Sequence, residues 1–509
     1  MSRSTRAAGI MVAALMIAAR SLPAQTSSLT FNSATKARSV LTAALKAIGG
    51  LDAIEQLPTI TREYAIDNTD LAQLEHPLAA NQRRAPSPGY LIQIRDYRAG
   101  DAVDLSSGVI PGGQPFANRT VLRGDTSFFY QYGAGILQRA QPALVTARRS
   151  RMESAEIEGL LLSAWRNRGP GALRWLGATR VAGRPADVVT FADRSQVTTA
   201  IYFDAETHLP LKTEQLQDDP IRGDVVSQTS FADWRPAGGL KIPYVIENRA
   251  NDELLRKLRV VAVRFGPAAD SMWRVPSDTF VAAALPPTPI ALGADTWVIP
   301  NGYQSAFVVF DDYVLVLEPG GSPQAARSTI AAATKAAPGK PIKYVVATHA
   351  HYDHLAGVRE YVAIGATIVT TPSAKSVIER AAKATHTLLP DTLSTNPRAP
   401  IIETLTDESR TFRDASHEVR VYNVGPTPHV EAMLFAYIPS IKTLFEGDAL
   451  DIPHPGHVRV GGEDTELFAR RIAELKLDVD RIVPVHGRIG TLADLDAAVA
   501  KRRSATPTR

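Results

Sequence analysis

Cysteine is absent from the 509-residue chain. This absence excludes disulfide bonds and lipid attachment at a processed N-terminal cysteine, so the fold must be held together mainly by packed cores. Long blocks of lysine or arginine are also missing, although the net charge is +4. The composition therefore gives no indication of nucleic-acid binding or of binding to a membrane surface.

Long apolar runs are scarce as well. Residues 7–19 are apolar, follow two arginines and precede the small residue Ala24. This pattern predicts a signal peptide over residues 1–24, and the apolar run is too short to span a bilayer comfortably. No second run approaches membrane-spanning length. We therefore expect no stable membrane insertion after cleavage, and a periplasmic or secreted location.

Histidine is rare but concentrated in one short stretch. Only 11 histidines occur in the chain, and three of them lie within residues 349–354, which read His-Ala-His-Tyr-Asp-His. The apolar, β-branched residues 342–347 come directly before and predict a buried strand. Ligands at the end of a strand lie on a rigid scaffold and face a crevice, so the stretch predicts a metal site.

Three later positions repeat this arrangement, because each places a ligand-type side chain directly after an apolar run. The three are His429 after residues 419–424, Asp448 after residues 443–445, and His486 after residues 481–484. Strand ends of this kind meet at one edge of a sheet. The sequence therefore predicts that all of these side chains lie close together.

The order His-x-His-x-Asp-His, followed by His429, Asp448 and His486, resembles the metallo-β-lactamase superfamily of metallohydrolases. The resemblance covers roughly residues 290–501 and implies a four-layer αβ/βα fold with the metals at one edge of its two sheets. It also implies a ligand set of seven residues. These are His349, His351 and His429 for the first metal, Asp353, His354 and His486 for the second, and Asp448 as the bridge between the two.

The donor set favours zinc, because it combines imidazole and carboxylate without thiolate, and iron or manganese also suit such donors. Two such ions, about 3.5–4 Å apart, can share a hydroxide and polarise the bond under attack. Asp353 is expected to orient that hydroxide as well as bind metal. The prediction is an exported hydrolase with two Zn²⁺ per chain that acts on a small-molecule substrate.

The bond that is cleaved stays open among ester-like, thioester, lactone, lactam and phosphoester bonds. A carboxylate at Asp448 resembles the thioesterase, phosphodiesterase, lactonase and sulfatase members more than the true β-lactamases. The absence of cysteine excludes the cysteine-type β-lactamase site. Two alternatives also stay open: a mononuclear iron enzyme of the same fold that oxidises sulfur compounds, and a lipid-binding or apolar-ligand-binding protein whose metal domain is secondary.

The front half predicts a helix over residues 37–48 and short β-rich segments from about residue 186. The segments are residues 186–191, 198–204, 209–215, 225–231 and 242–248, separated by turn-forming residues. Such a pattern is typical of an antiparallel meander. A helix followed by a long meander weakly resembles the half-barrel of periplasmic lipoprotein-carrier domains.

The predicted fold class is α+β, with the four-layer domain preceded by a mainly antiparallel β domain that has an N-terminal helix. The predicted organisation is a signal peptide at 1–24, the β domain at 25–275, a proline-rich linker at 276–289 and the hydrolase domain at 290–509. The sequence does not indicate an oligomeric state.

His454 and His457 are interpreted as part of a mobile, solvated loop, with substrate contact as the alternative. The same question of substrate contact is open for Tyr352, and residues 385–400 are expected to form a loop over the substrate.

Overall fold

The computed structural model describes residues 28–504 with internal gaps. The gaps are residues 70–86, 110–114, 154, 168, 170, 193–196, 278, 283–287, 301–302 and 407–408. The predicted signal peptide lies outside the described residues, so it stays a prediction. No helix in the described ranges is long and apolar enough to cross a membrane.

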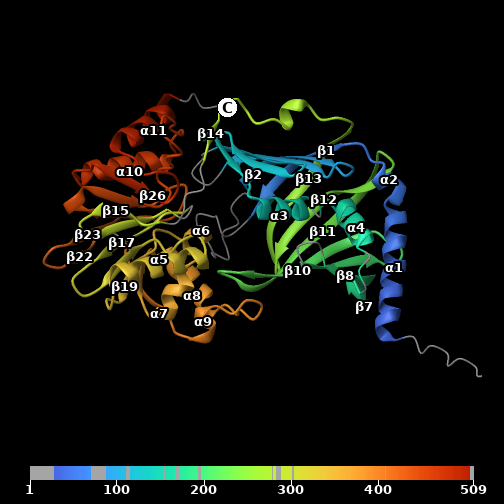
Figure 1. The fold of residues 1–509 in the computed structure, drawn as a ribbon, viewed down its shortest axis with the longest axis horizontal. Helices are drawn as coiled ribbons and strands as arrows, with labels where there is room; N and C mark the ends of the chain where they lie inside the picture. The colour runs from blue at the N-terminus through green and yellow to red at the C-terminus, as the bar shows by residue number, and fades with distance from the viewer. Residues whose placement is uncertain are drawn as a thin grey trace, which may run out of the picture.

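The N-terminal half is built on a 14-stranded, strongly curved sheet (Figure 1). Its strands are β1 (Ile60–Asn68), β2 (Ser87–Asp96), β3 (Asp101–Val109), β4 (Pro115–Arg123), β5 (Thr126–Gln131), β6 (Ile136–Arg139), β7 (Leu173–Val181), β8 (Arg184–Ala192), β9 (Thr198–Asp204), β10 (Pro210–Asp219), β11 (Gly223–Ala237), β12 (Leu240–Ala250), β13 (Glu253–Phe265) and β14 (Phe280–Val281). Neighbouring strands run antiparallel, except that β14 is parallel to β6. Strands β1 and β13 join the two halves of the meander, with Ile60 opposite Phe265.

Helix α1 (Leu29–Ala47) begins at Ser28, whose side chain accepts a hydrogen bond from the backbone N–H of Phe31 at 3.1 Å. Its buried face contains Ala37, Val40, Leu41, Ala44 and Leu45, as the predicted helical spacing requires. This face and α4 (Ile157–Arg166) pack on the sheet in one apolar core. Two more helices, α2 (Leu51–Glu55) and α3 (Pro142–Glu153), complete this half.

The predicted segments from residue 186 onward correspond to β8–β12, but strands begin much earlier, at Ile60. Buried arginines explain why the earlier strands lack a clear apolar–polar alternation. Arg62, Arg95 and Arg119 lie in β1, β2 and β4 with almost no exposed surface. A buried charge at a core-facing position looks like a surface position in the sequence.

Arg95 is fixed by a buried ionic network where α4 meets the sheet. Its Nε donates to Glu156 at 2.8 Å, and its Nη2 donates to Asp104 at 2.7 Å. Burial raises the pKa of Glu156, so this carboxylate depends on the guanidinium to stay ionised.

Substitution of Arg95 by methionine is expected to lower the free energy of unfolding by about 3–5 kcal/mol, because it leaves Glu156 buried without its cation. Urea unfolding followed by circular dichroism measures this loss. The exposed pair between Arg259 and Asp67 is a matched control. Arg259→Met is expected to cost about 1 kcal/mol or less, and equal losses for the two variants would contradict the prediction.

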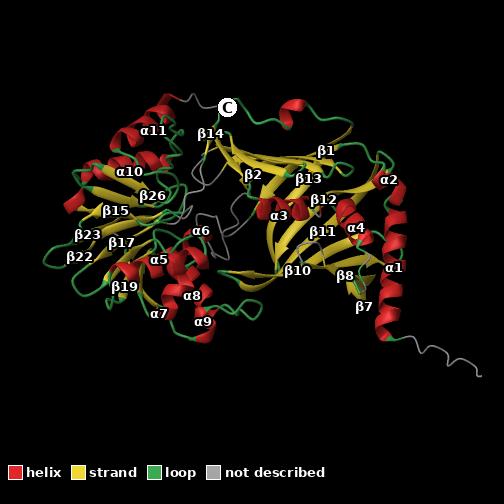
Figure 2. Cartoon of the chain, viewed as in Figure 1, coloured by secondary structure: helices red, strands yellow, loops and turns green. Residues whose placement is uncertain are grey.

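The C-terminal part contains two sheets packed face to face (Figure 2). The first consists of β15 (Ile290–Gly293), β16 (Thr296–Ile299), β17 (Ser305–Val309), β18 (Val314–Leu317), β19 (Ile342–Val346), β20 (Thr367–Thr370) and β21 (Ile401–Thr404). The second consists of β22 (Arg410–Arg413), β23 (Glu418–Asn423), β24 (Leu434–Ile438), β25 (Thr443–Glu446) and β26 (Arg481–Pro484). Leu315, Val346, Val421 and Phe445 lie in the shared core between the sheets.

Helices cover the outer faces of both sheets. The helices of this part are α5 (Pro323–Ala336), α6 (Tyr352–Leu355), α7 (Val358–Ile364), α8 (Pro372–Lys383), α9 (Thr392–Thr395), α10 (Glu463–Glu474) and α11 (Leu492–Ser504). Residues of α5, α7 and α8 share a core with the first sheet, and residues of α10 and α11 share one with the second. This is the predicted four-layer αβ/βα arrangement, and a large β domain precedes it, as predicted. The predicted domain boundaries stay predictions.

Candidate metal centre

Four strands carry the predicted ligands to one edge of the two sheets. The buried strand β19 leads directly into residues 348–351 and the single turn of α6. His429 follows β23, Asp448 follows β25 and His486 follows β26. Since β25 and β26 are parallel neighbours, their carboxyl ends place Asp448 and His486 side by side.

The structure brings all seven predicted residues together in two groups. His349, His351, His429 and Asp448 form the first group, and Asp353, His354 and His486 form the second. Within each group, one ligand-type atom from every residue lies within 4.8 Å of the others. This division matches the one that the resemblance implies, while the role of these residues as metal ligands is a prediction.

Asp448 connects the two groups through its two carboxylate oxygens. Its Oδ2 lies 3.0 Å from His429 Nε2 and 3.6 Å from His349 Nε2, on the first group. Its Oδ1 lies 2.9 Å from His354 Nε2 and 3.0 Å from His486 Nε2, on the second. One oxygen toward each group is the arrangement of a bridging carboxylate.

Ring nitrogens of neighbouring histidines face one another at short distances, an arrangement that favours a cation bound between them. His349 Nε2 faces His351 Nδ1 at 3.1 Å, and His354 Nε2 faces His486 Nε2 at 3.3 Å. His349, His351 and His354 are fully buried. Nitrogen lone pairs that converge in a buried space are satisfied by a cation bound between them, as in N/O-type zinc sites.

The pKa shifts divide the candidate ligands: those of His349, His351 and Asp448 favour the forms that bind metal, whereas the pKa values of His354 and His486 are raised, since the Asp448 carboxylate beside them outweighs the effect of burial. Burial lowers the pKa of His349 to about 4 and holds the pKa of His351 well below its usual range. Burial opposes ionisation of Asp448, but His354, His486 and His349 around it hold its pKa well below the usual value. Neutral imidazoles and an ionised carboxylate are the forms that coordinate cations.

Buried groups lie behind two of the candidate ligands. Thr348 Oγ1 lies 3.0 Å from His349 Nδ1, and Glu318 Oε1 lies 3.6 Å from His354 Nδ1. A hydrogen bond such as that of Thr348 fixes the orientation of a ligand imidazole, whereas the Glu318 carboxylate lies beside His354 without a hydrogen bond to it. Gly447 permits the close approach of the Asp448 turn, because a Cβ there would lie 2.8 Å from Thr348 Oγ1.

Two residues near the centre carried no sequence signal, Glu318 and Tyr303. Glu318 follows β18 with a φ of 73°, and both of its carboxylate oxygens are buried without a hydrogen-bond partner in the described part of the chain. The Tyr303 ring lies edge-on to His486, with centroids 4.7 Å apart. Burial raises the pKa of the Tyr303 hydroxyl, and the carboxylates of Asp353 and Asp448 raise it further, so this group keeps its proton.

His454 and His457, predicted to lie in a mobile, solvated loop, are partly exposed but are held by contacts with the N-terminal half. His454 Nε2 donates to the carbonyl oxygen of Ala134 at 3.0 Å, and His457 Nε2 donates to that of Gly133 at 2.8 Å. Both side chains therefore contact the β5–β6 turn of the N-terminal half. His208 lies in an exposed turn between β9 and β10, apart from the candidate ligands.

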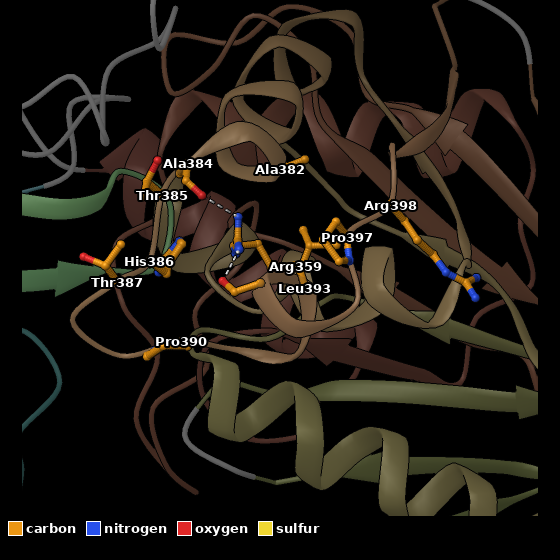
Figure 3. A pocket seen from close by; sticks show the side chains of 11 residues that line it. Arg359, Ala382, Ala384, Thr385, His386, Thr387, Pro390, Leu393, Pro397 and Arg398 are labelled. Carbon is orange, nitrogen blue, oxygen red and sulfur yellow. Dashed lines mark hydrogen bonds between the residues drawn. The ribbon is translucent and has the colours of Figure 1, made fainter.

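The segment at residues 385–400 contains α9 and borders a cavity of about 560 Å³ (Figure 3). Arg359 points into this cavity and donates to the carbonyl oxygen of Ala384 at 3.3 Å. It also binds Asp391 through Nε at 2.5 Å and Nη2 at 2.9 Å. Arg359 thus ties this segment to α7, which follows the ligand motif.

No curated protein matches the chain. Among solved structures, the chain is similar to a metallo-β-lactamase from Pontibacter korlensis, with 18% identity, a TM-score of 0.31, and coverage of 43% of this chain and 99% of that one. It is also similar to the metallo-β-lactamase FIM-1 from Pseudomonas aeruginosa in its mono-zinc form, with 16% identity, a TM-score of 0.32, and coverage of 43% and 96%.

A family model described as the metallo-β-lactamase superfamily matches residues 299–486. The matched range contains every strand end that carries a candidate ligand, from β19 to β26. The C-terminal part of the chain is therefore a domain of the metallo-β-lactamase superfamily.

Proposed function

We propose that this protein is a dinuclear zinc hydrolase of small-molecule substrates. The observation that carries the proposal is the position of Asp448, whose two oxygens face two separate groups of histidines. A single-metal site would need only one of these groups. The second group, with Asp353, His354 and His486, supplies the ligands for another cation.

The residues of the chain have distinct tasks in this proposal. The seven ligands would hold two divalent cations, which lower the pKa of a bound water and polarise the bond to be cleaved. Asp353, which is partly exposed and belongs to the second group, would orient the water. Tyr303 keeps a proton beside His486 and can donate it in a hydrogen bond to substrate.

We further propose that the bond is ester-like, thioester, lactone, lactam or phosphoester. The absence of cysteine and the carboxylate at Asp448 support a site unlike that of cysteine-type β-lactamases. All candidate donors of the centre are nitrogen or oxygen, a set that suits Zn²⁺ and also iron or manganese, so the metal content decides between hydrolysis and the alternative iron chemistry.

The test is elemental analysis of the purified full-length protein together with a hydrolysis panel of a lactone, a thioester, a phosphodiester and nitrocefin. We expect about two zinc ions per chain and turnover of at least one substrate. His351→Ala is expected to abolish turnover and to lower the zinc content, because it removes a ligand of the first group. His208→Asn is the control, since His208 lies in an exposed turn of the N-terminal half, apart from the seven candidate ligands. Protein without metal, or unchanged zinc content in His351→Ala, would overturn the proposal.

A further inference from the structure

The hairpin between β10 and β11 reaches from the N-terminal half into the metal domain (Figure 1). Ile221 at its tip is 1% exposed and belongs to the same core as Val345, Ala350 and Leu355 around the ligand motif. The backbone N–H of Asp224 donates to the carbonyl oxygen of Thr385 at 2.7 Å. The hairpin tip is thus built into the metal domain.

Gly223 shows how closely the two backbones approach at this tip. Its φ is 78°, and a Cβ at this position would lie 2.3 Å from the carbonyl oxygen of Thr385. The carboxylate of Asp224 accepts hydrogen bonds from the backbone N–H groups of Thr387 and Leu388, each at 3.0 Å. His386 adds a contact to Asp218 at 2.7 Å.

Arg222 lies at the same tip, with a side chain that is only 6% exposed. Its Nε donates to Glu253 at 3.2 Å, and its Nη1 donates to Asp219 at 3.4 Å. The guanidinium carbon lies 4.6 Å from the centre of the Tyr352 ring. Two carboxylates of the N-terminal half therefore fix a cation against this ring, a contact that strengthens when it is shielded from water.

Tyr352 lies between the candidate ligands His351 and Asp353 and opens α6. Its side chain is 8% exposed, and its buried hydroxyl has no hydrogen-bond partner in the part of the chain that the structure describes. Helix α6 is one turn of four residues, too short to define its own orientation by backbone hydrogen bonds. The packing of its side chains therefore orients the turn that carries Asp353 and His354, with Leu355 buried in the core and the Tyr352 ring packed against Arg222.

A second contact lies on the other side of the centre. The β5–β6 turn accepts the hydrogen bonds from His454 and His457, which belong to the loop after Asp448. Phe280 of β14 stacks on His454, with centroids 4.4 Å apart. The N-terminal half thus contacts chain segments beside both Asp353 and Asp448.

We propose that Arg222 is a positioning residue of the metal centre: by packing on Tyr352, it holds α6 in the orientation that turns Asp353 and His354 toward His486. The proposal rests on the proposed dinuclear function. It assigns to the N-terminal half a direct part in assembling the second metal site, beyond anchoring one domain on the other.

The test compares three substitutions in the full-length protein: Arg222→Met, Arg222→Lys and Asp224→Ala. Zinc affinity at each site is measured by competition with a chromophoric chelator, together with kcat, KM and the unfolding midpoint. Arg222→Met is expected to weaken the second zinc site about 10–100-fold, the usual effect of losing an outer-shell partner. We expect kcat to fall with it while KM changes little, and Arg222→Lys to restore part of both because it keeps a cation over the ring.

Asp224→Ala is the matched control, because it removes hydrogen bonds of the same hairpin tip without touching the ligand motif. It is expected to lower the unfolding midpoint while both zinc affinities stay as in the wild type. If Arg222→Met does not fold, Tyr352→Leu tests the same contact. It is expected to weaken zinc binding at the second site by a similar factor.

Equal zinc affinities in Arg222→Met and Asp224→Ala would overturn the positioning role while leaving the dinuclear function intact. A wild-type protein that binds no zinc would overturn the proposed function itself. The two failures are therefore distinguishable by the wild-type measurement alone.

Discussion

Replacement of Asp448 by asparagine is expected to abolish hydrolysis and to reduce the zinc content from two ions per chain to one or none. The amide keeps the shape of the side chain but lacks the charge that faces both histidine groups, at 3.0 Å from His429 and 2.9 Å from His354. Metal-centred stabilisation of charge in the transition state contributes several kcal/mol. We therefore expect kcat/KM to fall by at least about 10³-fold.

Two measurements check this result, elemental analysis and steady-state kinetics with the best substrate of the panel. Asp478→Asn is the matched control, because Asp478 is an exposed carboxylate of the same domain that pairs with Lys442 at 2.7 Å. The control is expected to keep wild-type activity and zinc content. Two bound zinc ions and near-normal turnover in Asp448→Asn would show that the carboxylate does not bridge.

The grouping of the seven candidate ligands could be predicted from the sequence because the motifs that carry them are local. Three histidines within residues 349–354 stand out in a chain with 11 histidines. The other candidate ligands each end an apolar run, and strand ends converge at a sheet edge whatever the loop lengths are. The four-layer fold followed from the resemblance that these motifs carry.

Residues that support the ligands could not be predicted, because their partners are set by strand order. Glu318 lies near His354 because β18 pairs with β19 in parallel. A local sequence pattern does not predict this strand pairing. Tyr303 precedes β17 and contacts His486, which lies near the other end of the domain's sequence. In the sequence each is an isolated polar or aromatic residue.

The contacts between the two halves of the chain could not be predicted from the sequence either. The stretch from Asp218 to Asp224 reads as an ordinary polar turn, yet it contains Ile221 and Arg222, which are buried against the metal domain. His454 and His457 looked solvated for the same reason, since their partner carbonyls lie in a distant turn. Hydrophobic periodicity describes single elements and cannot reveal such docking.

Removal of the metals with a chelator is expected to lower the unfolding midpoint strongly. A ligand that binds only the folded protein at 100 times its Kd adds about 2.7 kcal/mol of stability, so two sites together add about 5 kcal/mol. For a domain of this size, 1 kcal/mol corresponds to about 2–4 °C, which gives an expected fall of about 10–20 °C.

Without the cations, the converging nitrogens of His349 and His351, 3.1 Å apart, and of His354 and His486, 3.3 Å apart, lose their shared partner in a buried space. The apo centre therefore has no substitute for the metal, and the loss should be reversed by added Zn²⁺. Scanning calorimetry before chelation, after it and after zinc addition measures the effect, with zinc-saturated chelator as the control.

Asp448→Asn should respond much less to the chelator, because its centre holds one ion or none from the start. An unchanged midpoint after complete zinc removal would mean that the seven side chains are satisfied without metal, which contradicts the dinuclear site.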